Sequence, residues 1–120
     1  MQRSLVVKLT TGESEGERVN QAFMVSATAL ASGVRVSLWL TGEASWFGLS
    51  GRAEAFDLAL ATPLDELRDT VLAGGTLTVC TQCAARRTIS EGDLLAGVRL
   101  AGATTFVEEV LADGAQALVY

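Results

Sequence analysis

Apolar residues recur along the chain with two periods, which predict alternating strands and helices. Short, mostly β-branched apolar runs predict strands at residues 4–10, 34–40, 76–80, 98–100 and 117–120. Apolar positions spaced as on one helix face predict helices at residues 17–32, 62–74, 82–87 and 103–112. A brief helix or loop is expected at 43–49, and mainly loop is expected at 53–61.

The second of these helices has clear local signals at both ends. Thr62 is expected at its N-cap and Pro63 at its first helical position, where a missing N–H group is harmless. Gly74 and Gly75 are expected to end it, and Gly33 is expected to end the first helix in the same way.

Strands that alternate with helices predict βαβ units and a largely parallel sheet. The strands are nearly continuous apolar runs, which favours a sheet covered on both faces. The chain of 120 residues is expected to form one domain, residues 1–120. In such folds, ligands bind beyond the carboxyl ends of the strands. The polar or small residues expected to form that rim are Thr11, Gly12, Thr41, Gly42, Glu43, Thr81 and Gln82.

Both cysteines of the chain lie in the turn that joins the strand at 76–80 to the following helix. A helix start carries unpaired N–H groups and a partial positive charge, which favour the thiolate form of a nearby cysteine. Arg86 and Arg87 follow within one helical turn and are expected to stabilise such an anion. The sequence therefore predicts a reactive cysteine, Cys80 or Cys83, and leaves the choice between them open.

Other interpretations of the same residues remain. Cys80 is also consistent with a small apolar residue that finishes a buried strand. The Cys-x-x-Cys spacing is consistent with a dithiol and disulfide cycle, although no aromatic-Cys-Gly-Pro context surrounds it. Zinc is disfavoured because two cysteines supply half of a four-ligand site. We expect no metal and no cofactor.

The residue composition and net charge of the chain exclude several classes of function. The chain has no histidine, which excludes Ser-His-Asp triads, Cys-His dyads and histidine metal sites. Its net charge of −5 argues against nucleic acid and anionic membranes as partners. No long apolar run suits a membrane span, and the start of the chain does not resemble a signal peptide, so we expect a cytoplasmic protein with reduced thiols.

The chain resembles the DsrE/DsrF-like sulfur-relay family, which includes TusD-type persulfide carriers. The resemblance rests on the strand at 5–8, the helix that ends at Gly33, the strand end at 40–42 and the segment 79–89, in that order. It implies a three-layer α/β/α domain with a mostly parallel five-stranded sheet, assembled as a homo-oligomer, a trimer or hexamer. It also implies a persulfide on Cys80 or Cys83, and protein donors and acceptors of sulfur.

The leading hypothesis is therefore a small persulfide carrier or sulfurtransferase. The rival hypothesis is a non-catalytic assembly or ligand-binding module with the same fold. Association is also expected because aromatic residues crowd segments that are not obviously part of one small core, namely Trp39, Trp46, Phe47 and Phe56.

Overall fold

The structure is a computed structural model that describes residues 2–120. Its strands are β1 (Ser4–Leu9), β2 (Arg35–Leu40), β3 (Thr76–Cys80), β4 (Arg99–Ala101) and β5 (Ala115–Val119). Its α-helices are α1 (Gly16–Ala31), α2 (Arg52–Ala55), α3 (Leu64–Gly74), α4 (Thr81–Arg86) and α5 (Ala103–Val110). Three 3-10 helices complete the elements: η1 (Glu13–Glu15), η2 (Gly42–Gly48) and η3 (Glu91–Asp93).

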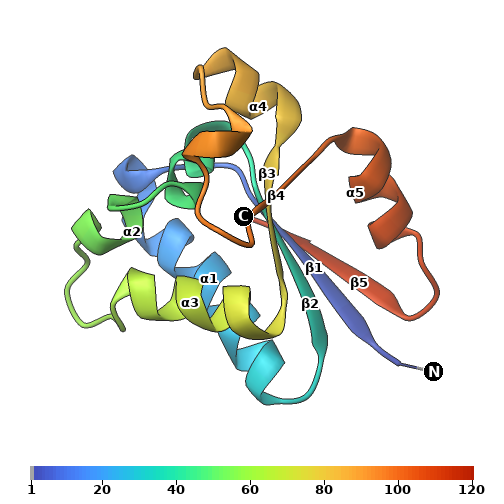
Figure 1. Cartoon of the computed structure of the whole chain (residues 1–120). Helices are drawn as coiled ribbons and strands as arrows, with labels where there is room; N and C mark the ends of the chain where they lie inside the picture. The colour runs from blue at the N-terminus through green and yellow to red at the C-terminus, as the bar shows by residue number, and fades with distance from the viewer. Residues whose placement is uncertain (1) are drawn as a thin grey trace.

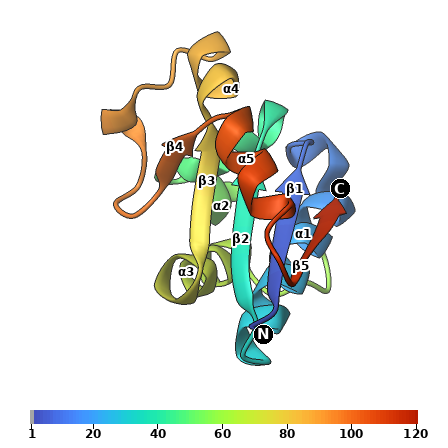
Figure 2. The same cartoon turned by 90° about the vertical axis from the view of Figure 1, so that its right-hand side faces the viewer.

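The five strands form one sheet in the order β4-β3-β2-β1-β5, and every neighbouring pair is parallel. The α/β class, the five strands and the parallel sheet are confirmed; the sheet is wholly parallel. The chain builds outward from β1 to β4 and then crosses back through α5 to place β5 beside β1. Figures 1 and 2 show α5 alone on one face of the sheet, with α1 and α3 on the other.

The face under α1 and α3 holds the aliphatic core. Val7, Leu38 and Leu77 point into it from three neighbouring strands and are fully buried. Val19 and Phe23 of α1 pack against them. Burial of such side chains is the main driving force for folding, so this face supplies most of the apolar stabilisation.

The face under α5 is polar and aromatic, which the prediction of near-continuous apolar strands missed. Alternate strand residues point to opposite faces, so the neighbours of the core residues point toward α5. Lys8, Trp39 and Thr78 pair in register across β1, β2 and β3 and form one row on this face. The side chains of Ser37, Thr78 and Arg99 are tied there by hydrogen bonds to neighbouring groups. One helix therefore covers a face that the sequence pattern predicted to be apolar.

Several element boundaries differ from prediction. Pro63, with extended backbone (ψ 133°), is the N-cap of α3 in place of Thr62, since its carbonyl accepts the first bonds of the helix, from the N–H groups of Glu66 and Leu67. The short helix α2 occupies part of the expected loop and begins after Gly51, which has φ +85°. The strand β3 has the predicted bounds.

The aromatic residues on which the expectation of association rested are covered within the chain, and association stays a prediction. Phe47 is 4% exposed and lies in the aliphatic core, and Trp46 and Phe56 pack against that core, whereas Trp39 is 1% exposed on the face under α5. Phe47 makes edge-to-face contacts with Phe23 and Phe56. The tertiary fold covers these residues on two faces of the sheet, which the spacing along the chain does not reveal.

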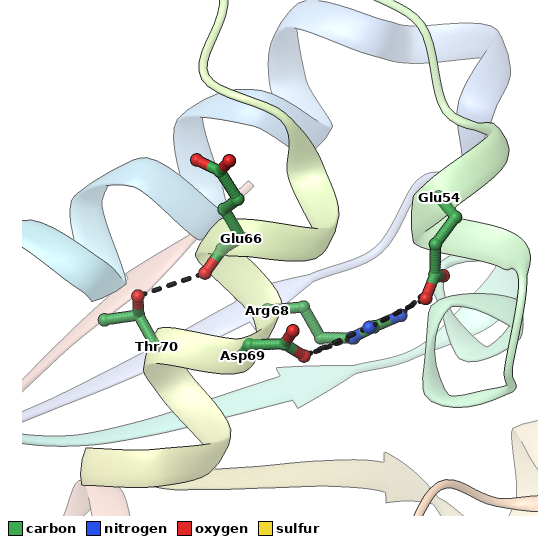
Figure 3. Close-up of polar contacts among 5 residues, drawn as sticks. All are labelled: Glu54, Glu66, Arg68, Asp69 and Thr70. Carbon is green, nitrogen blue, oxygen red and sulfur yellow. Dashed lines mark hydrogen bonds and ion pairs between the residues drawn. The ribbon is translucent and has the colours of Figure 1, made fainter.

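A buried arginine joins α2 to α3 (Figure 3). Arg68 is 5% exposed, and its guanidinium donates to both carboxylate oxygens of Glu54, at 2.8 and 3.0 Å. Asp69 accepts a third bond from the Arg68 Nε atom at 3.1 Å. These charge-assisted bonds satisfy a cation that would otherwise be costly to bury. In the described residues, no helix combines the length and apolarity that crossing a membrane requires.

Candidate active site

A pocket of about 460 Å³ opens at the carboxyl ends of β1, β2 and β3, beneath the start of α5. This is the edge at which the sequence predicted a site. Its lining residues come from six elements and the turns beside them: Lys8, Thr10, Trp39, Thr41, Gly42, Cys80, Gln82, Cys83, Gly102, Ala103 and Phe106. Both cysteines line it.

Cys80 ends β3 and is the N-cap residue of α4. It shares strand parity with Thr78, so it lies on the polar face of the sheet, and its side chain is partly exposed. Burial raises the pKa of its thiol. Four influences lower the pKa by more, so that the net shift is downward: polar contacts with the N–H and the thiol of Cys83, a contact with the N–H of Gln82, and the charge of Lys8. None of these contacts is a full capping hydrogen bond.

Cys83 lies in the first turn of α4 and is 8% exposed. Its Sγ atom accepts a hydrogen bond from the N–H of Gly42 at 3.2 Å. Gly42 has φ +55°, and a Cβ atom at this position would lie 2.7 Å from the carbonyl oxygen of Thr10. Glycine is thus required where the end of β2 turns its N–H toward the sulfur.

The two arginines do not line the pocket. Arg87 donates from Nε to Glu43 at 2.7 Å and from Nη1 to the carbonyl of Cys83 at 3.1 Å. Arg86 is exposed on α4. The bond from Arg87 is the main influence that lowers the pKa of Glu43; desolvation opposes it, and a bond from the Trp46 ring N–H lowers the pKa further. Stabilisation of a sulfur anion by Arg86 or Arg87 stays a prediction.

The structure brings only part of the predicted rim to the pocket. Thr41, Gly42 and Gln82 line it, whereas the others lie outside it: Thr11, Gly12, Glu43 and Thr81. Gly12 instead packs against Glu43, so closely that a Cβ atom would lie 2.8 Å from the Cβ atom of Glu43. The turns that follow β1 and β2 therefore pack directly against each other at this point.

A family model for the DsrE/DsrF-like family matches residues 4–119 of the chain. The chain belongs to the DsrE/DsrF-like family. Among solved structures, it is similar to the YchN protein from Escherichia coli, with a TM-score of 0.82, 18% identity and full coverage of both chains. It is also similar to MTH1491, a protein of unknown function from Methanobacterium thermoautotrophicum, with a TM-score of 0.69, 14% identity and full coverage of both. No curated protein sequence matches it.

Sequence reasoning missed several pocket residues of this DsrE/DsrF-like chain. Lys8 is the only lysine of the chain and the only charged residue of the pocket lining. Its Nζ atom lies 5.1 Å from the ring centre of Phe106, whose ring meets that of Trp39 edge to face at 5.3 Å. Lys8 is a charged residue within an apolar strand, and this feature of the sequence could have identified it as a candidate site residue. The remaining missed residues, Thr10, Gly102 and Ala103, had no comparable signal.

Glu109 holds α5 over the polar face of the sheet. Its carboxylate accepts bonds from Ser37 Oγ at 2.6 Å, Trp39 Nε1 at 2.9 Å and Arg99 Nη2 at 2.7 Å. Burial raises the pKa of Glu109, but these three donors lower it by more. The carboxylate therefore stays ionised near neutral pH and keeps Phe106, one turn earlier on α5, against Trp39.

The DsrE/DsrF-like pocket combines a polarised thiol, one cation and aromatic walls. A thiol with a lowered pKa is a nucleophile, and a neighbouring ammonium group favours the anion formed on it. These properties suit nucleophilic attack by Cys80 on an electrophilic sulfur.

Proposed function

We propose that this protein is a persulfide carrier that accepts sulfane sulfur on Cys80. The observation that carries the proposal is the position of Cys80: a partly exposed thiol with a lowered pKa, in a pocket whose single charge is the ammonium of Lys8. Of the two cysteines, Cys80 is favoured because it is partly exposed, whereas Cys83 is only 8% exposed to an incoming donor.

In this proposal, the Cys80 thiolate attacks the outer sulfur of a donor persulfide. A new S–S bond forms on Cys80 while the donor S–S bond breaks, and its electron pair leaves with the donor thiolate. Lys8 and the first N–H groups of α4 stabilise the negative charge before and after transfer. Donor and acceptor are proposed to be proteins of the cytoplasm, where thiols are kept reduced.

Intact mass after exposure to inorganic polysulfide tests the carrier function. Wild type is expected to gain a sulfur atom, Cys80→Ser is expected to gain none, and Thr81→Ala in the same turn is expected to behave as wild type. Undiminished uptake by Cys80→Ser, or no uptake by both wild type and Cys83→Ser, contradicts the proposal.

A second candidate, a non-catalytic assembly module, is supported by one observation on the outer surface. Val107 on α5, Leu111 directly after α5 and Val119 on β5 expose 47%, 77% and 66% of their surface. Exposed apolar side chains of this kind are common at subunit contacts. We propose that this surface joins copies of the chain into a trimer or hexamer. Assembly is then either a second function beside sulfur transfer or the function of the protein without sulfur transfer.

Sedimentation at micromolar concentration measures this association. Wild type is expected to sediment as an oligomer, and Leu111→Glu is expected to shift it toward the monomer. The matched substitution Leu60→Glu, at a fully exposed leucine on a distant loop, is expected to have no effect. A wild-type monomer contradicts the assembly.

A further inference from the structure

We propose that Cys83 resolves the Cys80 persulfide, forming a Cys80–Cys83 disulfide and releasing hydrosulfide. This inference rests on the proposed function and adds a second activity to the same site. It makes the protein a sulfide-releasing device as well as a carrier. The partner that reduces the disulfide back to two thiols is then a protein with a reducing dithiol.

The first support is the position of the two thiols. Cys80 is the N-cap and Cys83 the third residue of α4, and both line the same pocket. Side chains at these two helix positions approach each other in capping boxes. The chain has such a box at η3, where Ser90 Oγ and Asp93 Oδ2 lie 2.9 Å apart. The same spacing favours an approach of the Cys83 side chain to that of Cys80, and a polar contact between the two thiols is among the influences that lower the pKa of Cys80.

The second support is the difference in exposure between the thiols. Cys80 is partly exposed, whereas Cys83 is 8% exposed and lies behind it. A donor that enters the pocket therefore reaches Cys80 first. Once the persulfide has formed, the inner sulfur of Cys80 is the electrophile next to Cys83, which needs no movement of an outside molecule to react.

The third support is the bond from the N–H of Gly42 to the sulfur of Cys83, at 3.2 Å. This bond fixes the position of the Cys83 sulfur within the pocket that Cys80 also lines. The positive φ of Gly42 and the 2.7 Å approach to Thr10 exclude a side chain there, so this N–H is held in place by the backbone.

The step balances without an added oxidant. The electron pair of the Cys83 thiolate forms the new bond to the sulfur of Cys80, and the persulfide S–S bond breaks. The outer sulfur leaves with that electron pair as hydrosulfide, and the proton of the Cys83 thiol passes to solvent or to the leaving sulfur. The outer sulfur is reduced and the sulfur of Cys83 is oxidised. A dithiol reductant then returns both cysteines to thiols.

The test uses the full chain loaded with inorganic polysulfide, freed of excess reagent and incubated without thiols. Wild type is expected to release about one hydrosulfide per chain, as one disulfide forms per persulfide lost. Its final mass is expected to be that of the reduced chain less two hydrogen atoms, with Cys80 and Cys83 linked in one peptide. Cys83→Ser is expected to keep the added sulfur and release no hydrosulfide.

The controls separate the two proposals. Cys83→Ala is a second variant for the nearly buried position, and circular dichroism checks the fold of each variant. A wild type that holds its persulfide as stably as Cys83→Ser overturns the resolving step and leaves the carrier function standing. Failure of both proteins to take up any sulfur overturns the carrier function and this inference with it. Disulfide formation only between chains, seen as a doubled mass, also overturns it.

Discussion

The two faces of the sheet have opposite chemistry although the same strands build both. On the face under α1 and α3, Val7, Leu38 and Val79 are fully buried in an aliphatic core. On the face under α5, the next residues along the same strands are Lys8, Trp39 and Cys80, and all three line the pocket. One face holds the fold together, and the other presents reactive groups on a rigid support. Strand alternation thus separates stability from chemistry within five or six residues.

The largest effect is expected when the thiol is moved between the faces. The double substitution Val79→Cys and Cys80→Val places the sulfur among the aliphatic side chains, since position 79 is fully buried. Sulfur uptake should fall to background, because the thiolate is neither stabilised nor reachable there. Intact mass measures uptake, and thiol titration of native and denatured protein locates the thiol. Uptake at the level of wild type would contradict the division between the faces.

The next effect compares one residue from each face of β2. Leu38→Ala is expected to lower the free energy of unfolding by roughly 2–5 kcal/mol, because it leaves a cavity in the aliphatic core. Ser37→Ala, which removes a 2.6 Å bond to Glu109, is expected to cost roughly 1–2 kcal/mol. Denaturant unfolding measures both. Equal costs would show that the two faces share the work of stabilisation.

A smaller effect is expected from the charge in the pocket. Lys8→Met should raise the pKa of Cys80 and slow sulfur uptake severalfold near neutral pH, because the ammonium group favours the thiolate. The deficit should shrink at higher pH, where the thiol ionises without help. Arg18→Met, which removes the same charge from α1 on the other face, is the matched control. A deficit that is constant across pH would assign Lys8 a structural role.

A pH effect is expected at the junction of α2 and α3. Hydrogen bonds from Arg68 and from the backbone lower the pKa of Glu54 from 4.5 to about 2. A depressed pKa means that this stabilisation is present above pH 4.5 and is lost as the pH falls toward 2. Glu54→Gln should therefore flatten the acid limb of stability against pH, whereas Glu91→Gln on the exposed turn should not. Urea midpoints at graded pH measure this slope.

The smallest effect is expected at Arg87, because its bonds go to Glu43 and to the backbone of Cys83 and it does not line the pocket. Arg87→Gln should change sulfur uptake only slightly, and Arg86→Gln should leave it unchanged. Rates of uptake by intact mass compare them. A loss as large as that of Lys8→Met would restore the role that the sequence predicted for these arginines.

The local sequence was sufficient for much of this architecture. The β-branched run that ends at Cys80 predicts β3 with its observed bounds, because strand propensity and the following helix start are local properties. Segment 79–89 and the other strand ends resemble those of the DsrE/DsrF-like family. The family model that matches residues 4–119 confirms this assignment. The position of both cysteines at the carboxyl edge follows from the parallel sheet alone.

The composition of the pocket was decided by the tertiary structure. Lys8 meets Trp39 through strand register, and Phe106 arrives above both because α5 crosses back over the sheet on its way to β5. Arg87 and Glu43 pair across a distance in sequence that no local pattern encodes. Local propensity acts over a few residues, whereas the pocket is formed by residues up to about a hundred positions apart, brought together by the burial of the opposite face.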